Sequence, residues 1–490
     1  MDLTQIFQKI LWWIVLPFSC ISFCITPLTN DTRIFIGAAA IADRFYPLPY
    51  GWDAAYEVKP IGNRILNWIF YKVADSVIPF ISNNYFWFGV IIKICALVIL
   101  IGCCWYVSRR ICKDNVYTFP LLILAFVCQA NFGIMMAEWF AVLFSLVTTA
   151  LLLEENKNWS ILAGVLIVGI ALLKGITSLM VIPVICAIYL LGRSVKWRCA
   201  ATGFIISSAT FLILCATFWP YQLLDIFLSG KVAHVGHFTF TTLLSYFWIT
   251  QTSMSLPVFL ITYIPIVACG FPILLIVSTI YLSRNDYARL ALLAIMWLIP
   301  AMIVIIQSEF IGYHYLVLAF PAVITILLFM QMRPKYKWVI PAIIGFLVAT
   351  LIVFNCFFGS YSLYEYSFWA SKERNADIIN DRFDLNNQSE LLYLDPGDAP
   401  YYFHANSSCR YITPMPVQRN DPQRWNLTAW PQYSDNRDCI LKYQGEYILT
   451  DVSNGSLFSY SFFRDPDIAA MIANNYTKVS SASWEVFRKR

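Results

Sequence analysis

Eleven apolar stretches separated by polar segments constrain this chain more than any other feature of its sequence. A helix needs about 20 apolar residues to cross the hydrocarbon core of a bilayer. Because 59% of the 490 residues are hydrophobic and only 13% are charged, a soluble protein could not cover its surface. We therefore predict a polytopic α-helical membrane protein. Its transmembrane helices are expected near 10–27, 86–106, 117–131, 137–153, 160–173, 177–192, 201–219, 257–282, 290–306, 315–331 and 338–357. The fifth and sixth could instead form one broken unit around Lys174.

The charges of the short loops predict the orientation in the membrane. Most short-loop Lys and Arg residues lie in SRRICKDN, EENKN, GRSVKWR, SRNDYAR and QMRPKYK. The positive-inside rule makes these loops and the N-terminus cytoplasmic. Residues 28–85 and everything after about 358 are then extracytoplasmic. The net charge of +5 forms no basic tract, which argues against a nucleic-acid partner.

The C-terminal segment 359–490 is polar, and we predict a small extracytoplasmic α/β domain there, after a transmembrane domain over 1–358. Strand-like runs (ELLYLD, CRYITPMP, EYILTDV, SWEVFRK) alternate with helix-like runs (YSFWASKERNADIINDRF, PDIAAMIANNY). Cys409 and Cys439 are its two cysteines. An extracytoplasmic disulfide and two free thiols are both compatible with the sequence.

The first outer loop, residues 28–85, contains two expected helices. TRIFIGAAAIADRF predicts a short one. In IGNRILNWIFYKVADSV, helical spacing puts Ile65, Leu66, Ile69, Phe70 and Val73 on one face and Asn63, Arg64, Asn67 and Tyr71 on the other. This amphipathic pattern is typical of a helix lying in the membrane interface.

A few ionisable residues fall at membrane level, where charge is costly and needs a reason. Asp31, just after the first stretch, is either a helix N-cap or a carboxylate that deprotonates a hydroxyl. The other three also have purely structural explanations. Glu138 could be a carboxylate favoured by the dipole at a helix start, and Lys174 could extend its ammonium to the interface. His314, between Tyr313 and Tyr315, could belong to an interfacial aromatic belt.

Taken together, these residues map to the outer face. Asp31, Glu138, Lys174 and His314 are joined there by Asp53, Glu57, Lys59 and Arg64 of the loop. Carboxylates beside cations at a lipid–water boundary suit a ligand with a phosphate and reactive hydroxyls. The sequence indicates no firm cofactor. His234 and His237 form a pair without a third ligand nearby, so a divalent metal is only a minor alternative.

The order of these motifs resembles the glycosyltransferase-C superfamily, in the branch of protein O-mannosyltransferases and lipid A aminoarabinose transferases. The similarity rests on Asp31 after the first stretch, VKPIGNRILNWIF, MMAEWFAVLFSL, ALLKGITSL and YHYLVLAFPAV, and it covers roughly residues 10–335. Two positions depart from the pattern. Asp31 is followed by Thr32 instead of a second acid, and Ile61 replaces the second Pro of the family's KPP element.

The resemblance implies transfer of a sugar from a polyprenyl or dolichyl monophosphate, with inversion, on the extracytoplasmic side. Asp31 would be the general base, Lys59 would contact the lipid phosphate, and Glu138 would line the same cavity. Tyr313, His314 and Tyr315 match loosely a cationic and aromatic cluster near the phosphate. The acceptor would be a glycan, a lipid or a protein.

Three other functions compete with this expectation. A transporter or lipid flippase also carries polar residues among its spans, usually near the bilayer midplane and in two matching halves. No internal repeat is evident in this sequence. A receptor or assembly factor that binds through its tail, and a ligase or oligosaccharyltransferase that uses a lipid diphosphate, are the remaining alternatives.

Overall fold

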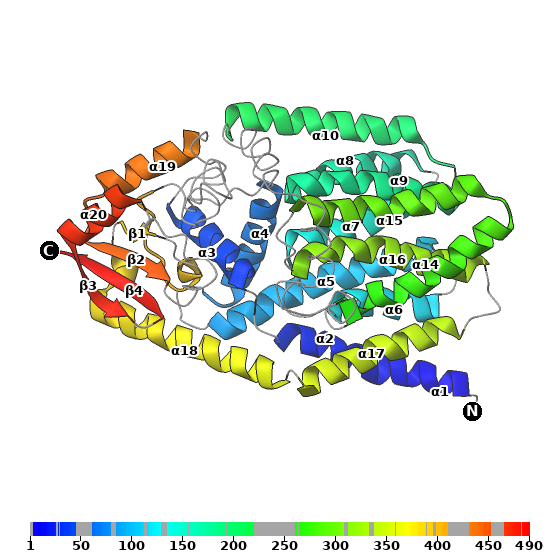
Figure 1. The fold of residues 1–490 in the computed structure, drawn as a ribbon, viewed down its shortest axis with the longest axis horizontal. Helices are drawn as coiled ribbons and strands as arrows, with labels where there is room; N and C mark the ends of the chain where they lie inside the picture. The colour runs from blue at the N-terminus through cyan, green and yellow to red at the C-terminus, as the bar shows by residue number, and fades with distance from the viewer. Residues whose placement is uncertain are drawn as a thin grey trace. The chain divides into compact units, whose positions relative to one another are not determined.

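The structure is a computed structural model, and it is mostly helical with a small sheet near the C-terminus (Figure 1). It describes residues 3–25, 28, 30–45, 61–79, 85–111, 115–128, 135–154, 156–192, 194–219, 260–261, 264–307, 312–332, 338–357, 359–388, 390–394, 398–409, 431–451, 465–481 and 483–490. The chain forms two compact units. The first contains 1–26, 93–212 and 237–362, and the second contains 27–92, 213–236 and 363–490.

The first unit is built from apolar helices. Its α-helices are α1 (Leu3–Ile10), α2 (Leu16–Ile25), most of α5 (Tyr85–Ile111), α6 (Asn115–Val127), α7 (Ala137–Leu152), α8 (Lys157–Leu173), α9 (Val181–Leu190), α10 (Trp197–Thr217), α14 (Pro265–Ser283), α15 (Tyr287–Gln307), α16 (Ala319–Met332) and α17 (Val339–Phe357). A π-helical turn, η1 (Leu11–Val15), joins α1 to α2. Two 3-10 segments, η4 (Gly175–Met180) and η5 (Gly312–Leu318), precede α9 and α16.

Among the described residues, six helical segments are long and apolar enough to cross a bilayer. They are Gln8–Ile25, Tyr85–Ile111, Trp197–Thr217, Pro265–Ser283, Tyr287–Ile306 and His314–Met332. Each overlaps one of the predicted stretches, which confirms the prediction of a helical membrane protein. The other five stretches contain shorter apolar helices: Tyr117–Val127, Ala137–Leu152, Lys157–Leu173, Gly175–Leu190 and Val339–Thr350. The count of eleven spans therefore stays a prediction.

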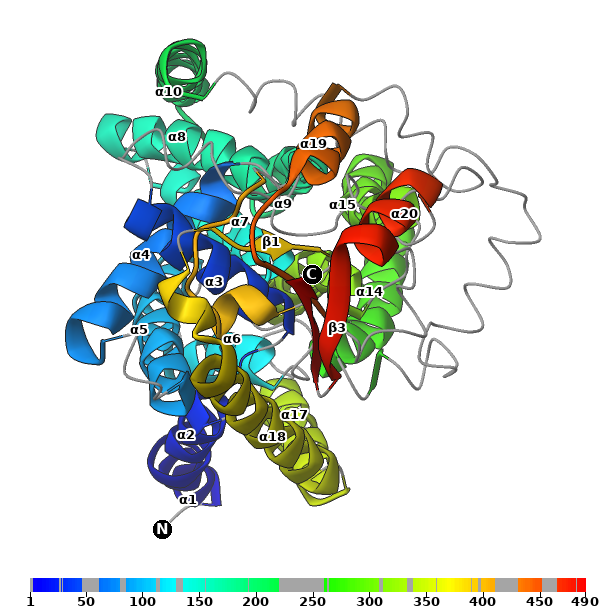
Figure 2. The same ribbon diagram turned by 90° about the vertical axis from the view of Figure 1, so that its left-hand side faces the viewer.

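Two helices form the centre of the first unit. Nearly every residue of α7 and α16 is buried, whereas α5, α10, α14 and α15 expose large apolar side chains as lipid-facing helices do. On the periphery, α10 runs beside α8 (Figure 1, Figure 2). They touch through glycines, because a Cβ at Gly164 would overlap the Ala200 carbonyl and one at Gly203 would overlap the Ile161 carbonyl. Such small-residue contacts are a common way to pack membrane helices.

The second unit combines residues 27–92 and 213–236 with the C-terminal segment. Its helices are α3 (Asn30–Phe45), α4 (Ile61–Val77), α18 (Gly359–Phe383, of which 363–383 belong here), α19 (Pro431–Lys442) and α20 (Pro466–Asn475), with the 3-10 turns η7 (Leu385–Asn387) and η8 (Ala399–Tyr401). Four strands, β1 (Leu392–Tyr393), β2 (Tyr447–Asp451), β3 (Tyr476–Ser481) and β4 (Trp484–Lys489), form a sheet in the order β1-β2-β4-β3. β1 is parallel to β2, and the other pairs are antiparallel.

The sheet is covered on both faces (Figure 1). On one face, Ile440 of α19 and Ile468 and Ile472 of α20 pack in an apolar cluster with Leu392 and Ile448 of the strands. On the other face, α18 places the Lys372 ammonium 5.4 Å from the centre of the Trp484 ring. The sheet and the helices on its two faces thus form three layers, and the division of the chain into domains 1–358 and 359–490 stays a prediction.

The individual predictions for the C-terminal segment are only partly matched. Strands occur within ELLYLD, EYILTDV and SWEVFRK, and helices cover YSFWASKERNADIINDRF and PDIAAMIANNY. The predicted strand CRYITPMP lies outside the described residues apart from Cys409. The sequence does not predict α19 or β3, because PQYSDNRDCILK and YTKVSS have no clear apolar period.

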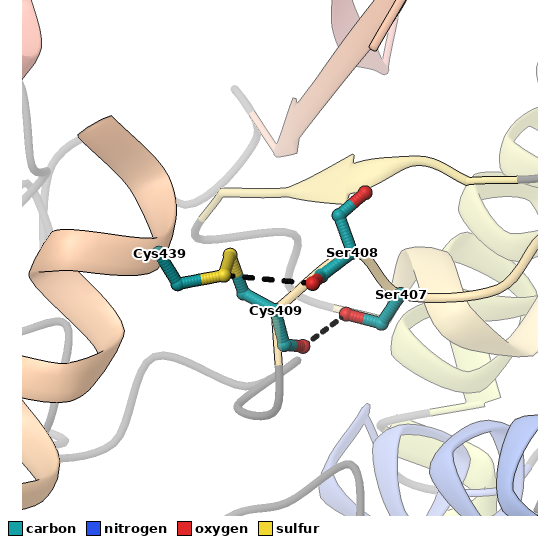
Figure 3. The surroundings of a disulfide bond; sticks show 4 residues. All are labelled: Ser407, Ser408, Cys409 and Cys439. Carbon is teal, nitrogen blue, oxygen red and sulfur yellow. Dashed lines mark hydrogen bonds between the residues drawn. A yellow bond between two sulfur atoms is a disulfide. The ribbon is translucent and has the colours of Figure 1, made fainter. Parts of the chain in front are cut away.

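The C-terminal segment contains a disulfide between Cys409 and Cys439 (Figure 3). Their Cα atoms are 5.9 Å apart, within the usual range for a disulfide. The bond resolves the choice that the sequence left open between a disulfide and two free thiols, and it ties α19 to the segment that follows η8.

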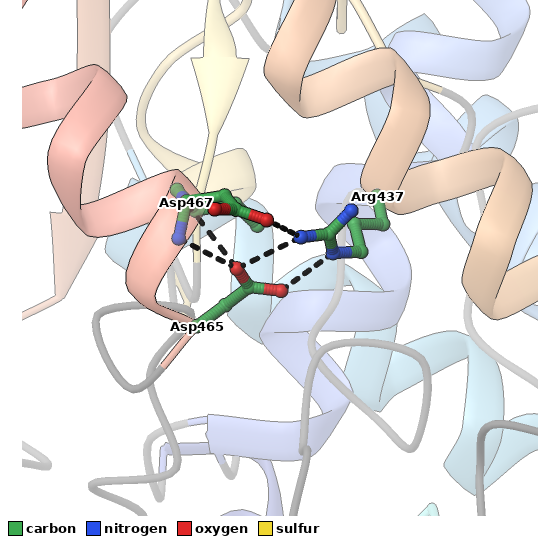
Figure 4. Close-up of polar contacts among 4 residues, drawn as sticks. Arg437, Asp465 and Asp467 are labelled. Carbon is green, nitrogen blue, oxygen red and sulfur yellow. Dashed lines mark hydrogen bonds and ion pairs between the residues drawn. The ribbon is translucent and has the colours of Figure 1, made fainter.

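An ionic cluster joins α19 to the start of α20 (Figure 4). Arg437 donates to both Asp465, at 2.6 Å from Nε, and Asp467. Asp465 also accepts hydrogen bonds from the N–H groups of Asp467 and Ile468, as an N-cap does. Burial raises the pKa of Asp465, but these hydrogen bonds outweigh it and hold that pKa below its ordinary value.

We expect Gly164→Val to separate α8 from α10. The new side chain would meet the Ala200 carbonyl, and overpacking of this kind costs about 1–3 kcal/mol. Gly169→Val in the same helix is the matched control, because a Cβ there meets nothing within 4 Å. Thermal unfolding in detergent should show a lower Tm for Gly164→Val alone. Equal Tm values for both variants would contradict this helix contact.

We also expect the second unit to lose stability on acidification through His404. Burial, and then the charge of Arg44, lower the pKa of His404 from 6.5 to about 4. The unfolded imidazole binds a proton below about 6.5, and the folded one only below about 4. The contribution of the neutral His404 imidazole to the free energy of unfolding is therefore complete above pH 6.5. As the pH falls from 6.5 to 4, about 3 kcal/mol of this contribution is lost.

Chemical unfolding of the full chain between pH 7.5 and 4.5 measures this loss. His404→Gln removes the titrating group, so its unfolding free energy should fall less steeply with pH than that of the unaltered protein. Parallel pH profiles for the two proteins would show that His404 is not the group responsible.

Candidate functional site

Three ionisable side chains meet inside the apolar first unit. Lys174 Nζ donates to Glu138 Oε1 at 2.6 Å and lies 3.2 Å from His314 Nε2. His314 Nε2 is 3.9 Å from the same Glu138 oxygen. The side chains of Glu138 and His314 are only 1% and 3% exposed, whereas that of Lys174 is 22% exposed. A buried carboxylate thus faces an ammonium that is partly accessible from outside.

Glu138 owes its position to the start of α7. Met136 is the extended N-cap residue, so Glu138 lies in the first helical turn, where the helix dipole favours a carboxylate. Just before it, Met135 adopts a φ of 65°. This left-handed conformation costs a non-glycine residue about 1–3 kcal/mol. Backbone strain three residues before a buried carboxylate is more typical of a functional site than of an ordinary helix start.

Lys174 sits where the helical backbone breaks. α8 ends at Leu173, Lys174 is extended with φ −159° and ψ 124°, and η4 begins at Gly175. The hydroxyl of Thr177 donates to the carbonyls of Ile170, at 2.7 Å, and Lys174, at 2.6 Å. The bond to Ile170 satisfies a carbonyl near the end of the interrupted helix, whereas the Lys174 carbonyl also accepts the Thr177 N–H at 2.8 Å. The structure therefore contains two helical segments separated by a break at Lys174, and both two spans and one broken unit are compatible with it.

His314 belongs to η5, a 3-10 segment that leads into α16. Pro321 cannot donate the N–H that an α-helix would direct at the Val317 carbonyl, which favours a tighter turn before it. The next residue, Tyr315, lines a pocket of about 430 Å³ together with Leu318 and apolar side chains of α14 and α15. A single short segment thus contributes to an ionic cluster and to an almost wholly apolar pocket.

This arrangement can bind an anion and a hydroxyl at once. Glu138 Oε2 is buried and accepts no hydrogen bond from the described part of the chain. A buried acceptor without a donor is costly, so it is suited to a hydroxyl supplied by a ligand. The exposed side of Lys174 is suited to a phosphate. The three residues therefore provide both signs of charge at one point.

Asp31, the predicted base, lies in the first turn of α3 in the second unit. α3 begins at Asn30, so Asp31 is inside the helix and not its N-cap, and its side chain is outside the described part of the structure. Close by in the sequence, Arg33 is buried, and its Nε lies 3.3 Å from Asp398 Oδ2. Lys372 of α18 donates to Asp398 Oδ1 at 2.7 Å.

This second ionic cluster anchors α3 against the C-terminal segment. All three of its side chains are at most 4% exposed. The anchorage is close, because a Cβ at Gly37 of α3 would overlap the backbone of Pro400 in η8. A buried charge with its partner removed is strongly destabilising, so these contacts fix the helix that carries Asp31.

The remaining predicted residues are distributed unevenly. The structure brings Glu138, Lys174 and His314 together. Arg64 is a buried residue of α4, in the second unit. The backbone of Tyr313 lies in η5, and its side chain is outside the described part of the structure. Asp53, Glu57 and Lys59, and the pair His234 and His237, fall outside the described residues. Among the residues that are described, no group of three or more His, Cys, Asp or Glu could hold a metal.

α4 buries most of its polar face and exposes part of its apolar face, and its position at a membrane surface stays a prediction. Its polar residues Asn63, Arg64 and Asn67 are buried, whereas Ile69 and Val73 are 43% and 42% exposed. Phe70 departs from the predicted stripe, since it is buried. An exposed apolar face with a buried polar face suits contact with lipid.

Sequence reasoning missed several buried charges. Lys93 in α5 is 1% exposed, and its ammonium lies 5.6 Å from the centre of the Phe23 ring. A lone Lys in FWFGVIIKICALVIL was a visible signal for it. Lys372 and Asp398 gave no such signal, because both lie in a polar segment where charges are ordinary.

Comparison with models of known protein families finds no match, and comparison with curated proteins finds none either.

We expect Glu138 and Lys174 to be coupled in stability. Lys174→Met would leave a buried carboxylate without its cation and should destabilise by about 3 kcal/mol. Glu138→Gln should cost less, because the Lys174 ammonium reaches solvent. The double variant should be more stable than the sum of the single losses predicts. Chemical unfolding of all four proteins measures this coupling, and additive losses would show that the pair does not interact.

Proposed function

We propose that this protein is a membrane glycosyltransferase that moves a sugar from a polyprenyl or dolichyl monophosphate to an acceptor hydroxyl. One observation carries the proposal: η5 contributes His314 to the Glu138–Lys174 cluster and Tyr315 to the adjoining apolar pocket. A lipid-linked phosphate needs this pairing of a cation with an apolar surface. The resemblance to the glycosyltransferase-C superfamily points to the same substrate.

Lys174 and His314 would hold the phosphate end of the donor. The partly exposed ammonium neutralises the leaving phosphate, and the Glu138 carboxylate orients that ammonium through its 2.6 Å hydrogen bond. The Oε2 atom of Glu138 would accept a hydrogen bond from a hydroxyl of the sugar. Lys59 of the first outer loop would add a second cation, as the resemblance to the glycosyltransferase-C superfamily implies. A neutralised lipid phosphate is a good leaving group, so no separate general acid is required.

Asp31 would be the general base. The acceptor oxygen attacks the anomeric carbon from the face opposite the phosphate and passes its proton to the Asp31 carboxylate. As the new carbon–oxygen bond forms, the bond to the phosphate oxygen breaks, and the lipid phosphate leaves with the electron pair. A single displacement of this kind inverts the anomeric centre. The anchorage of α3 through Arg33 and Asp398 supports this role, since a base must be held in place.

The disulfide supports an extracytoplasmic location for the C-terminal segment. Disulfides persist in oxidising compartments and are rare in the cytosol. Because Cys409 and Cys439 are bonded, the tail would lie outside, where lipid-phosphate sugars are used by the resembling family. This agrees with the loop charges, which make the N-terminus cytoplasmic.

A lipid transporter or flippase remains the second candidate. The break at Lys174 favours it, because transporters build their sites at interrupted helices. The same cluster and pocket would then bind a lipid phosphate without cleaving it. The two functions differ in whether the bond between sugar and phosphate is broken.

A reconstituted assay with a panel of polyprenyl-phosphate sugars tests the proposal. The unaltered protein should release polyprenyl phosphate from one of them. Asp31→Asn should lower turnover by about 100-fold or more, the scale of a lost general base, without weakening donor binding. Asn is also compatible with the start of a helix, so stability should be unchanged.

Asp381→Asn, an exposed carboxylate on α18, is the matched control and should be fully active. Turnover of Asp31→Asn within a few-fold of the unaltered protein would move the base elsewhere, first to Asp53 and then to Glu138. Movement of a fluorescent lipid phosphate across the bilayer without cleavage would favour the flippase.

A further inference from the structure

A second pocket, this one polar, lies within the second unit, and none of the residues to which the proposal assigns chemistry lines it. It has a volume of about 200 Å³. Its polar wall consists of Asp43 and Arg44 from the end of α3, Tyr71 and Asp75 from α4, and His404 from the segment after η8. Three separate parts of the chain thus contribute to one small cavity.

The charges around this pocket balance. Asp43 accepts hydrogen bonds from Trp68 Nε1 at 2.9 Å and from Lys72 Nζ at 3.0 Å, so its charge is already neutralised. Asp75 and Arg44 supply one charge of each sign. A cation would meet Arg44, and an anion would meet both carboxylates. This balance favours a neutral ligand.

The groups that line the pocket both donate and accept hydrogen bonds. Arg44 donates one of its N–H groups to the His404 carbonyl at 3.2 Å, and this bond holds the guanidinium at the pocket. The low pKa of His404, about 4, keeps its imidazole neutral near pH 7. Tyr71 brings an aromatic ring to the lining, and the centre of this ring is 6.2 Å from that of Phe88. Carboxylates, a guanidinium and an aromatic ring complement the hydroxyls and C–H face of a sugar.

We propose that this pocket binds one sugar ring. Its volume is below the roughly 300–1,000 Å³ of sites for drug-sized ligands, which suits a single ring. The ring would be part of the acceptor, so the acceptor would be a glycan. That second statement rests on the proposed transferase activity, whereas sugar binding does not.

The sugar in this pocket would not be the one that reacts. Asp43 is twelve residues from Asp31 along α3, or roughly 18 Å at 1.5 Å per residue. That distance exceeds one sugar ring. The pocket would therefore hold a more distant unit of an extended acceptor and select for its identity.

Saturation-transfer NMR on the full-length protein in nanodiscs tests the binding directly. The probes are the methyl glycosides of glucose, mannose, galactose and N-acetylglucosamine, with inorganic phosphate and ethanolamine as charged probes and no donor present. At least one glycoside should bind, and neither charged probe should displace it. Arg44→Gln and Asp75→Asn should each weaken its binding by about fivefold or more. Exposed Arg374→Gln and Asp381→Asn on α18 are the matched controls and should bind normally.

The outcome is decided by these variants and by their Tm values. Arg44 is at the surface, so Arg44→Gln should keep its Tm even if Asp75→Asn does not. No glycoside signal, displacement by a charged probe, or unchanged binding in a stable Arg44→Gln would overturn the proposal. If the protein cleaves donor, Arg44→Gln should raise the acceptor KM and leave kcat unchanged. Sugar binding without any donor cleavage would refute the transferase and leave the pocket intact.

Discussion

A carboxylate buried inside an apolar helical bundle needs a cation beside it, and the centre of the first unit is arranged around this constraint. The Glu138–Lys174 pair satisfies it. Three irregular features converge on the pair: the left-handed Met135, the break at Lys174 and the 3-10 turn that carries His314. The break at Lys174 separates two helical segments, whereas Met135 and the 3-10 turn directly precede α7 and α16, in a region where regular helix would satisfy the backbone best. The structure thus keeps a buried ion pair at the expense of its helical regularity.

Much of the helical framework could be predicted, because the length of an apolar stretch is a local signal. The meeting of Glu138, Lys174 and His314 was also foreseeable, since each lies at one end of an apolar stretch on the same predicted side. Contacts between distant polar segments could not be foreseen. Asp398 and Arg33 look like ordinary surface residues in the sequence, and only the fold shows that both are buried. The same is true of the pocket at Arg44 and His404, which depends on three separate segments.

The first outer loop and the C-terminal segment form one structural unit. α3 rests on η8 at Gly37 and is tied to α18 through Asp398. The tail is therefore more than an appendage that binds partners, because it holds the loop that carries the predicted base. On the same helix, Asp31 and the sugar pocket lie at opposite ends. With both proposals, the length of α3 sets the distance between the acceptor hydroxyl that reacts at Asp31 and the acceptor sugar that is bound in the pocket.

The disulfide has a consequence for the covalent connectivity of the tail. It joins residues 30 positions apart, so the chain between Cys409 and Cys439 is a closed ring. A protease that cut once within this ring would change the number of chain ends but not the number of covalently separate pieces. Under non-reducing electrophoresis such a nicked molecule would still migrate as one species, and only reduction would release the fragment that carries β2, β3 and β4. The sheet could therefore tolerate a break in its own connection to the membrane.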